Sequence, residues 1–184
     1  TSATARIRGI GTQGSNPGLE SAVGVFVDGV YRARNGVALT DLGEISQVEV
    51  LRGPQGTLFG RNTSAGLISV ATAGPDLAAF GASAEATIGD FGEQRFAGHL
   101  TAPLVRDELG VRVFASVSQR DGFNDSVGPT GEVDDVNNRD LWSVRAQTLW
   151  APAGVELDWR LIADYTERNE VCCAGVFYNP ATVN

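Results

Sequence analysis

The stretch Val48-Glu49-Val50-Leu51-Arg52-Gly53-Pro54-Gln55-Gly56-Thr57-Leu58-Phe59-Gly60-Arg61-Asn62 joins a short apolar run to a loop that contains three glycines. Residues 48–51 predict a β-strand, which stops where Pro54 removes a backbone donor and biases Gly53 away from helix. Glycine permits positive φ and close approach of backbones, so the glycines at 53, 56 and 60 favour a compact turn. The stretch therefore predicts a strand that ends in a tight, glycine-rich turn.

Segments on either side of this stretch indicate a small mixed α/β globule with much loop. Residues 23–27 have the apolar composition of a buried strand, and the turn signal Asp28-Gly29 follows them. Residues 67–71 predict another strand. Residues 41–46 predict one short helical turn, capped by Thr40 or Asp41.

From about residue 80 the sequence changes to strict alternation of apolar and polar residues, which is typical of strands with two unlike faces. Five stretches of roughly 8–12 residues show it, the length that a tilted strand needs to cross a membrane. They are residues 82–88, 95–102, 111–118, 142–150 and 157–165. After the first hairpin, tight and long links alternate, as they do in outer-membrane barrels.

The polar positions of these strands share one face and carry almost all of their charge. They include Glu85, Arg95, His99, Arg112, Arg145, Asp158, Arg160 and Asp164. A membrane barrel turns its apolar face toward lipid, whereas a soluble β-sandwich covers that face with other strands of the same chain. Arginine at strand centres favours the barrel, because a dry core does not tolerate it unpaired. Trp142 and Trp150 also favour it, since they lie on the apolar face about 20 Å apart, close to the separation of two aromatic girdles.

Composition excludes several classes of function. All 14 basic residues are arginine, 22 residues are acidic, and the net charge is -8. Nucleic-acid binding requires a basic footprint, so we do not expect it. No apolar run approaches the ~18 residues of a transmembrane helix. Because the sequence contains no methionine and opens with no signal peptide, we expect the chain to be a fragment of a longer protein.

We expect no enzyme activity, no cofactor and no metal site. His99 is the only histidine and has no second ligand or base at a definable spacing, so a satisfied structural histidine is expected. The long acidic link at residues 122–138, with Asp140 just after it, lacks the spacing of a calcium-binding loop and is expected to be a solvated loop. The adjacent Cys172 and Cys173 leave three interpretations open: a strained ring with each other, pairing outside the chain, or no function. A hydrolase is a distant candidate, since it would need a nucleophile and a base.

Residues 48–62 closely resemble the plug-domain signature of TonB-dependent outer-membrane receptors. Other segments agree with that family in order along the chain, and they are residues 7–9, 25–31, 66–70, 120–123 and 164–165. The resemblance implies that residues 1–75 are the C-terminal part of the plug domain and that residues 76–184 begin the receptor's β-barrel. The implied fold class is a mixed α/β plug followed by antiparallel transmembrane β-barrel strands, an incomplete barrel with about five of 22 strands. An open sheet leaves its edges unpaired in lipid, so these strands are not expected to insert or transport alone.

The resemblance also implies a function and its partners. A receptor of this family binds a scarce solute outside the bacterial outer membrane, such as an iron–siderophore complex, and imports it with energy delivered by TonB of the inner membrane. The expected partners are TonB, an extracellular metal chelate or other large solute, and outer-membrane lipid. The competing hypothesis is a soluble β-sandwich that serves as an adhesion or binding module.

Two sets of site residues follow from the resemblance. The first would hold the plug against the barrel through polar contacts, with Arg52 and Arg61 paired to acids such as Glu49 or to lumen-facing carboxylates. Its members are Glu49, Arg52, Gly53, Pro54, Gly56, Gly60 and Arg61. The second would contact an anionic metal chelate at the outward apex of the plug through charge and stacking, or else be ordinary plug surface. Its members are Arg8, Tyr31, Arg32 and Arg34.

Overall fold

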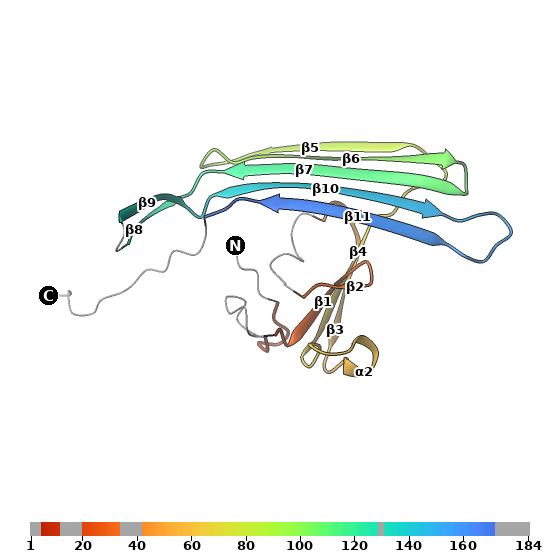
Figure 1. Cartoon of the computed structure of the whole chain (residues 1–184), viewed down its shortest axis with the longest axis horizontal. Helices are drawn as coiled ribbons and strands as arrows, with labels where there is room; N and C mark the ends of the chain where they lie inside the picture. The colour runs from red at the N-terminus through yellow and green to blue at the C-terminus, as the bar shows by residue number, and fades with distance from the viewer. Residues whose placement is uncertain (1–4, 12–19, 34–41, 129–130, 172–184) are drawn as a thin grey trace.

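The computed structural model of the chain describes residues 5–11, 20–33, 42–128 and 131–171. Within them the chain forms two larger sheets and a small two-stranded one (Figure 1). The predicted change from a mixed globule to longer alternating strands is present, because the strands before residue 73 have two to eight residues and the five strands of the second sheet have eight to twelve. Among these described residues, no α-helix combines the length and the apolar content that crossing a bilayer requires.

The first sheet contains four short strands in the order β2-β1-β4-β3. They are β1 (Val23–Val27), β2 (Val30–Tyr31), β3 (Ile45–Arg52) and β4 (Gly66–Thr72). β1 and β4 run parallel, with Val25 opposite Ile68, and their continuous apolar runs suit a pair that is covered on both faces. The core lies here, where Val23, Val25 and Leu67 are fully buried and Ile7 from the preceding segment packs in one cluster with Val23 and Val25.

One helical turn, α2 (Gly56–Phe59), connects β3 and β4. The helical turn predicted at 41–46 is wrong for the part that the structure describes, because residues 42–44 are not helical and Ile45 already begins β3. Pairing explains the difference: Ile45 lies opposite Thr72 in an antiparallel ladder, and such pairing outweighs a weak local helix propensity. The glycine-rich turn is present as predicted, and Gly60 ends it with a φ of 77°.

The second sheet contains five long strands, all antiparallel to their neighbours, in the order β11-β10-β7-β6-β5. They are β5 (Gly81–Ile88), β6 (Gln94–Val105), β7 (Leu109–Arg120), β10 (Arg139–Trp150) and β11 (Trp159–Arg168). The alternating stretches fall on these strands, with β11 beginning two residues later than predicted. The segment 122–138, predicted as a loop, instead contains a hairpin of β8 (Asn124–Gly128) and β9 (Gly131–Val136).

The two faces of the five-stranded sheet differ in chemistry. The face toward the first sheet buries polar side chains, and they include Arg112, Ser116, Ser143, Arg145 and Gln147. The opposite face carries exposed apolar side chains, among them Phe96, Leu100, Val113, Val117, Trp142, Trp150, Trp159 and Leu161. The register holds each row on one face, since Phe96 lies opposite Val117 and Val117 opposite Trp142. Figure 1 shows the first sheet under one face only, so the apolar face is left uncovered by the described chain.

Candidate functional site at the contact between the two sheets

Asp28 is the buried acid of the contact between the two sheets, with 3% of its side chain exposed. It follows β1 directly, and its amide donates to the Val70 carbonyl of β4 at 2.9 Å. Its carboxylate accepts hydrogen bonds from the Thr72 amide at 2.9 Å and from the Thr72 hydroxyl at 3.0 Å. Aspartate adopts positive φ more readily than most residues, so the φ of 49° at this turn is tolerated. The Asp28-Gly29 turn therefore fixes both the chain direction and the position of the carboxylate.

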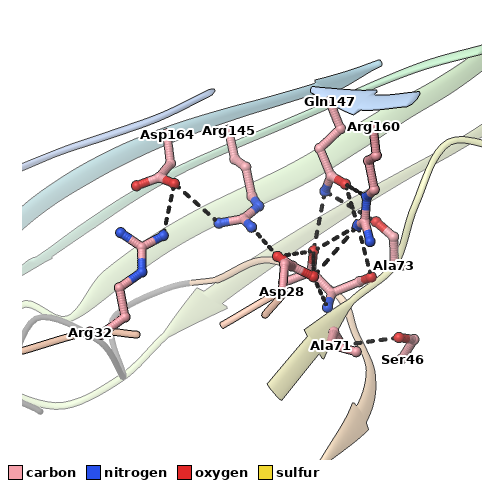
Figure 2. Close-up of polar contacts among 10 residues, drawn as sticks. Asp28, Arg32, Ser46, Ala71, Ala73, Arg145, Gln147, Arg160 and Asp164 are labelled. Atoms are coloured by element: carbon pink, nitrogen blue, oxygen red, sulfur yellow. Dashed lines mark hydrogen bonds and ion pairs between the residues drawn. The ribbon is translucent and has the colours of Figure 1, made fainter. Parts of the chain in front are cut away.

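Arg145, near the centre of β10, donates from Nη2 to the Asp28 carboxylate (Figure 2). Its Nη1 lies 3.6 Å from Oδ1 of Asp164, the residue directly opposite it on β11. Nη2 of Arg160 lies 3.6 Å from the second Asp28 oxygen, Oδ1. Since only 5% of the Arg145 side chain is exposed, the Asp28–Arg145 ion pair is shielded from bulk water.

Gln147 and Arg160 add hydrogen bonds to the backbone where β4 ends. The Gln147 side-chain amide donates to the Ala73 carbonyl at 3.2 Å, and Arg160 Nη2 donates to the Thr72 carbonyl at 3.2 Å. Arg160 Nε also donates to the Gln147 side-chain oxygen at 3.2 Å. These bonds attach the end of the first sheet to β10 and β11 at the point where the chain leaves it for β5.

Arg32 extends the cluster beyond β2. Its Nη2 donates to Asp164 Oδ1 at 3.1 Å, and both side chains are about one-third exposed. The charges alternate in sign: Arg32 from the first sheet, Asp164 and Arg145 from the second, Asp28 from the first and Arg160 from the second. Each buried charge thus has an opposite neighbour, which is the condition under which a protein interior accepts it.

Glu44, just before β3, makes a second contact with the long sheet. Its carboxylate accepts a hydrogen bond from Arg112 on β7 and lies 3.6 Å from Nδ1 of His99 on β6. The same Nδ1 is 2.7 Å from the Ser83 hydroxyl oxygen. His99 is therefore a satisfied, largely buried histidine, as the sequence predicts. A cavity of about 210 Å³ lies beside it, lined in part by Glu44, His99 and Phe114.

This arrangement is suited to holding two sheets in one register. Burying an ion pair costs desolvation that its attraction roughly offsets, whereas removing one partner costs about 3–5 kcal/mol because a buried charge is left alone. In the ranges that the structure describes, no three His, Cys, Asp or Glu side chains are placed to hold a metal ion. The cluster is therefore a specific attachment made of contacts that water or other polar groups are able to replace.

Comparison with known proteins points to one receptor family. The model for "TonB-dependent Receptor Plug Domain" matches residues 1–67. The pesticin receptors of Yersinia enterocolitica and Yersinia pestis are 46% identical over 57 residues, which cover 30% of this chain and 8% of each relative. The structure of the ferric yersiniabactin uptake receptor FyuA from Yersinia pestis is similar at a TM-score of 0.70 and 26% identity, covering 80% of this chain and 23% of that one. These matches support the interpretation of the chain as a fragment of a TonB-dependent receptor.

The same fold occurs in the pyoverdine outer membrane receptor FpvA from Pseudomonas aeruginosa PAO1, at a TM-score of 0.64 and 21% identity. That match covers 79% of this chain and 20% of FpvA. The chain thus spans less than a quarter of each of these relatives. Receptors of this family lie in the bacterial outer membrane, and this chain is located there, as the sequence predicts.

The receptor motif at 48–62 lies away from the charge cluster. Figure 1 shows α2 on the side of the first sheet that is distant from β5–β11. The Arg61 side chain is 79% exposed and pairs with Glu20 at 3.2 Å, while Glu49 accepts a hydrogen bond from Gln47 at 2.7 Å. Arg52 is exposed as well. The described residues therefore give Arg61 a different acid from the expected Glu49, and the contact of this motif with a barrel wall remains a prediction.

The residues predicted to contact solute do not form one group in the structure. Arg8 is exposed in a tight turn, with a φ of 51°, that Ile7 and Ile10 close by reciprocal backbone hydrogen bonds. The Tyr31 hydroxyl accepts a hydrogen bond from Asn62 at 2.9 Å, and Arg32 is engaged with Asp164. Arg34 lies outside the described residues, as do Cys172 and Cys173.

Sequence reasoning missed the acids that complete the cluster. Arginines at the centres of the polar strand faces already required carboxylate partners, so Arg112, Arg145 and Arg160 were identifiable from their spacing. Their partners Asp28 and Glu44 come from the other part of the chain. The signal available for Asp28 was its place in a turn directly after a buried strand.

Proposed function

We propose that the complete receptor that contains this chain is an energy-coupled importer of the outer membrane. Residues 1–75 are the C-terminal part of its plug domain, and residues 76–184 begin its β-barrel. It binds a scarce solute outside, imports it with energy from TonB, and catalyses no covalent chemistry. The observation that carries this proposal is the polarity of the five-stranded sheet, which buries arginines toward the plug and exposes tryptophans on the other side.

The exposed apolar face fits a lipid environment. Trp142 is 39% exposed, Trp150 48% and Trp159 62%, and the last two lie opposite each other where β10 ends and β11 begins. Trp142 stacks with Tyr165 toward the other end of these strands, at a centroid distance of 5.1 Å. Two aromatic rows separated along the strands are typical of the two membrane interfaces of a barrel. The soluble sandwich hypothesis requires strands of the same chain over this face, and the described residues supply none.

The polar inner face fits a plug that has to move. The plug meets the wall through Asp28, Arg32 and Glu44, which are charged groups whose contacts water is able to replace. The motif contains α2, which lies at the end of the first sheet distant from this wall (Figure 1), so in a closed barrel the motif would contact the opposite wall. That contact would engage Glu49, Arg52 and Arg61 and the backbone of Gly53, Pro54, Gly56 and Gly60.

The solute class is inferred from the relatives and from charge. One similar structure is described as a ferric yersiniabactin uptake receptor and another as bound to pyoverdine. An iron–siderophore complex is therefore the solute that we propose. Arg8, Tyr31, Arg32 and Arg34 would contact it on the outward side of the plug, where guanidinium groups and an aromatic ring suit an anionic chelate.

Uptake of iron tests the proposed function. The complete receptor is expressed in bacteria that lack other siderophore receptors, with and without TonB, and accumulation of radioactive iron is measured from ferric yersiniabactin and from ferric pyoverdine. We expect uptake of at least one chelate that stops when TonB is removed. Uptake that continues without TonB would overturn energy coupling, and TonB-dependent uptake of another solute class alone would overturn the iron assignment.

A further inference from the structure

On the five-stranded sheet, which is the wall side of the charge cluster, arginines outnumber carboxylates. Arg112, Arg145 and Arg160 contribute three guanidinium groups, and Asp164 contributes one carboxylate, which leaves a net charge of +2. The plug supplies the missing acids, Asp28 and Glu44. The neighbouring Arg95–Glu85 pair, at 3.3 Å, is neutral in itself and does not change this balance.

Withdrawal of the plug would leave this charge without its acids. Arginine stays protonated in proteins, so these guanidinium groups remain positively charged when the plug leaves. Arg145 keeps Asp164 at 3.6 Å, whereas Arg112 pairs with Glu44 and Arg160 with Asp28, and both of these acids belong to the plug. A cation on a largely desolvated wall is costly unless an anion or water replaces the lost partner.

We propose that Arg112, Arg145 and Arg160 form a second binding site, which receives the anionic groups of the solute in transit after Asp28 and Glu44 have left it. This inference rests on the proposed function. In the docked state the plug carboxylates occupy the site as internal substitutes for the solute.

The strand register sets the size of ligand that the patch would accept. Arg112 lies opposite Gln147 on β10, and Gln147 lies between Arg145 and the position opposite Arg160. The three arginines therefore occupy three neighbouring strands, about 10 Å across at the usual strand spacing. A guanidinium group binds a carboxylate through two parallel hydrogen bonds. The matching ligand class is a compact anion with two or more carboxylate or phenolate groups, which is a common chemistry of iron chelates.

The exchange couples solute to plug movement. Each plug carboxylate that leaves an arginine is replaced by a solute oxygen, so a bound anion lowers the cost of withdrawal. Linkage is reciprocal, and the withdrawn plug must therefore raise the affinity of the patch for the anion by the same factor. Solute that has passed the outer rim thus favours the open state.

Ion selectivity of the open lumen tests the patch without any solute. The complete receptor is placed in a planar bilayer, its plug is unfolded reversibly with urea, and the reversal potential is measured in a potassium chloride gradient. We expect the wild-type lumen to prefer chloride and Arg112→Gln/Arg160→Gln to lose that preference, with Arg112→Lys/Arg160→Lys restoring it. Arg106→Gln, whose side chain is 81% exposed in a strand connection, is the matched charge control.

Citrate then serves as a polyvalent probe of the open lumen. Each lost charge-assisted contact weakens binding about tenfold, so the double variant should need at least about tenfold more citrate to block the chloride current. If the double variant does not assemble, Arg160→Gln alone should give an intermediate shift, because this residue is one-third exposed. Unchanged selectivity and unchanged citrate block in whichever variant assembles would overturn the proposal. These bilayer measurements need no TonB, so their failure is distinguishable from loss of TonB-dependent iron uptake.

Discussion

Asp28→Asn is the substitution that tests the plug attachment most directly. The Asp28 carboxylate is 3% exposed and holds Thr72 of the plug together with Arg145 of the wall. Asparagine keeps an oxygen for the Thr72 amide and tolerates positive φ as well as aspartate does. The substitution therefore removes one charge from the interface and leaves the turn in place.

The expected loss of docking free energy depends on the carboxylate partner that Arg145 keeps. Removing one partner of a buried ion pair typically costs about 3–5 kcal/mol. Here Arg145 keeps Asp164 at 3.6 Å, and Arg160 is one-third exposed to solvent, so we expect a smaller cost than this range, about 2–3 kcal/mol. At 1.36 kcal/mol per factor of ten, the undocked plug should be populated about 30- to 160-fold more often.

Hydrogen exchange of the β1 and β4 amides measures that population, since these strands are protected as long as the plug stays folded and docked. The complete receptor is compared with Asp28→Asn and with Asp107→Asn, the same change at an aspartate of positive φ whose side chain is 74% exposed in a strand connection. The control should change exchange by less than about twofold, because an exposed polar contact contributes little. Protection in Asp28→Asn that matches the wild type, or equal loss in both variants, would refute the importance of the Asp28–Arg145 pair.

Three further predictions concern the fold, the membrane face and pH. Gly66→Ala should prevent normal plug folding, because Gly66 has a φ of 133° and an added Cβ would lie 2.2 Å from the Leu51 carbonyl oxygen. Protease resistance of the receptor measures plug folding. The control Gly56→Ala, whose added Cβ would meet no atom within 4 Å, should keep wild-type protease resistance. The fluorescence of the three tryptophans should be quenched by brominated lipid chains, and absence of quenching would contradict a lipid-facing apolar surface. Hydrogen bonds from the Ala78 amide and, second, the Ala79 amide lower the pKa of Asp76. The stability that these hydrogen bonds contribute to the folded chain is complete above the unfolded pKa of about 3.9, and it is lost only as pH falls through the lower folded pKa. The NMR chemical shift of the Ala78 amide should therefore stay constant from about pH 7 to about pH 5.

Local patterns in the sequence predicted the strands well because each pattern has one physical cause. Alternation with period two fixes both the strand and its two faces, so the polar position of Arg145 and the apolar position of Trp142 were readable directly. Local patterns predicted the structure less well where pairing of the backbone with another segment decides it. The acidic segment 122–138 was expected to be a loop because strands are poor in Asp and Glu, yet its backbone pairs as a hairpin.

Local sequence patterns could not identify the partners of the buried charges. Asp28 and Arg145 are separated by 117 positions, and the sequence contains many acids of which any could pair with a wall arginine. The strand register and the way in which the plug docks select Asp28 and Glu44 from among them. Arg61 of the motif shows the same limit, since the structure pairs it with Glu20, an acid that the sequence did not single out.

The position of Asp164 explains how a buried charge cluster remains separable. A simple pair of Asp28 and Arg145 would leave an isolated buried cation at the moment of release, at the full cost of an unpaired charge. Asp164 lies opposite Arg145 on the neighbouring wall strand and already contacts it at 3.6 Å. If the plug is released as proposed, Arg145 would keep Asp164 on its own side, while Arg32 would leave with the plug and free the same Asp164 oxygen. The two exchanges would compensate each other, so Arg145 would not be left without a carboxylate partner. Asp164→Asn should therefore slow plug release more than it weakens docking, which is the opposite of the effect expected for Asp28→Asn.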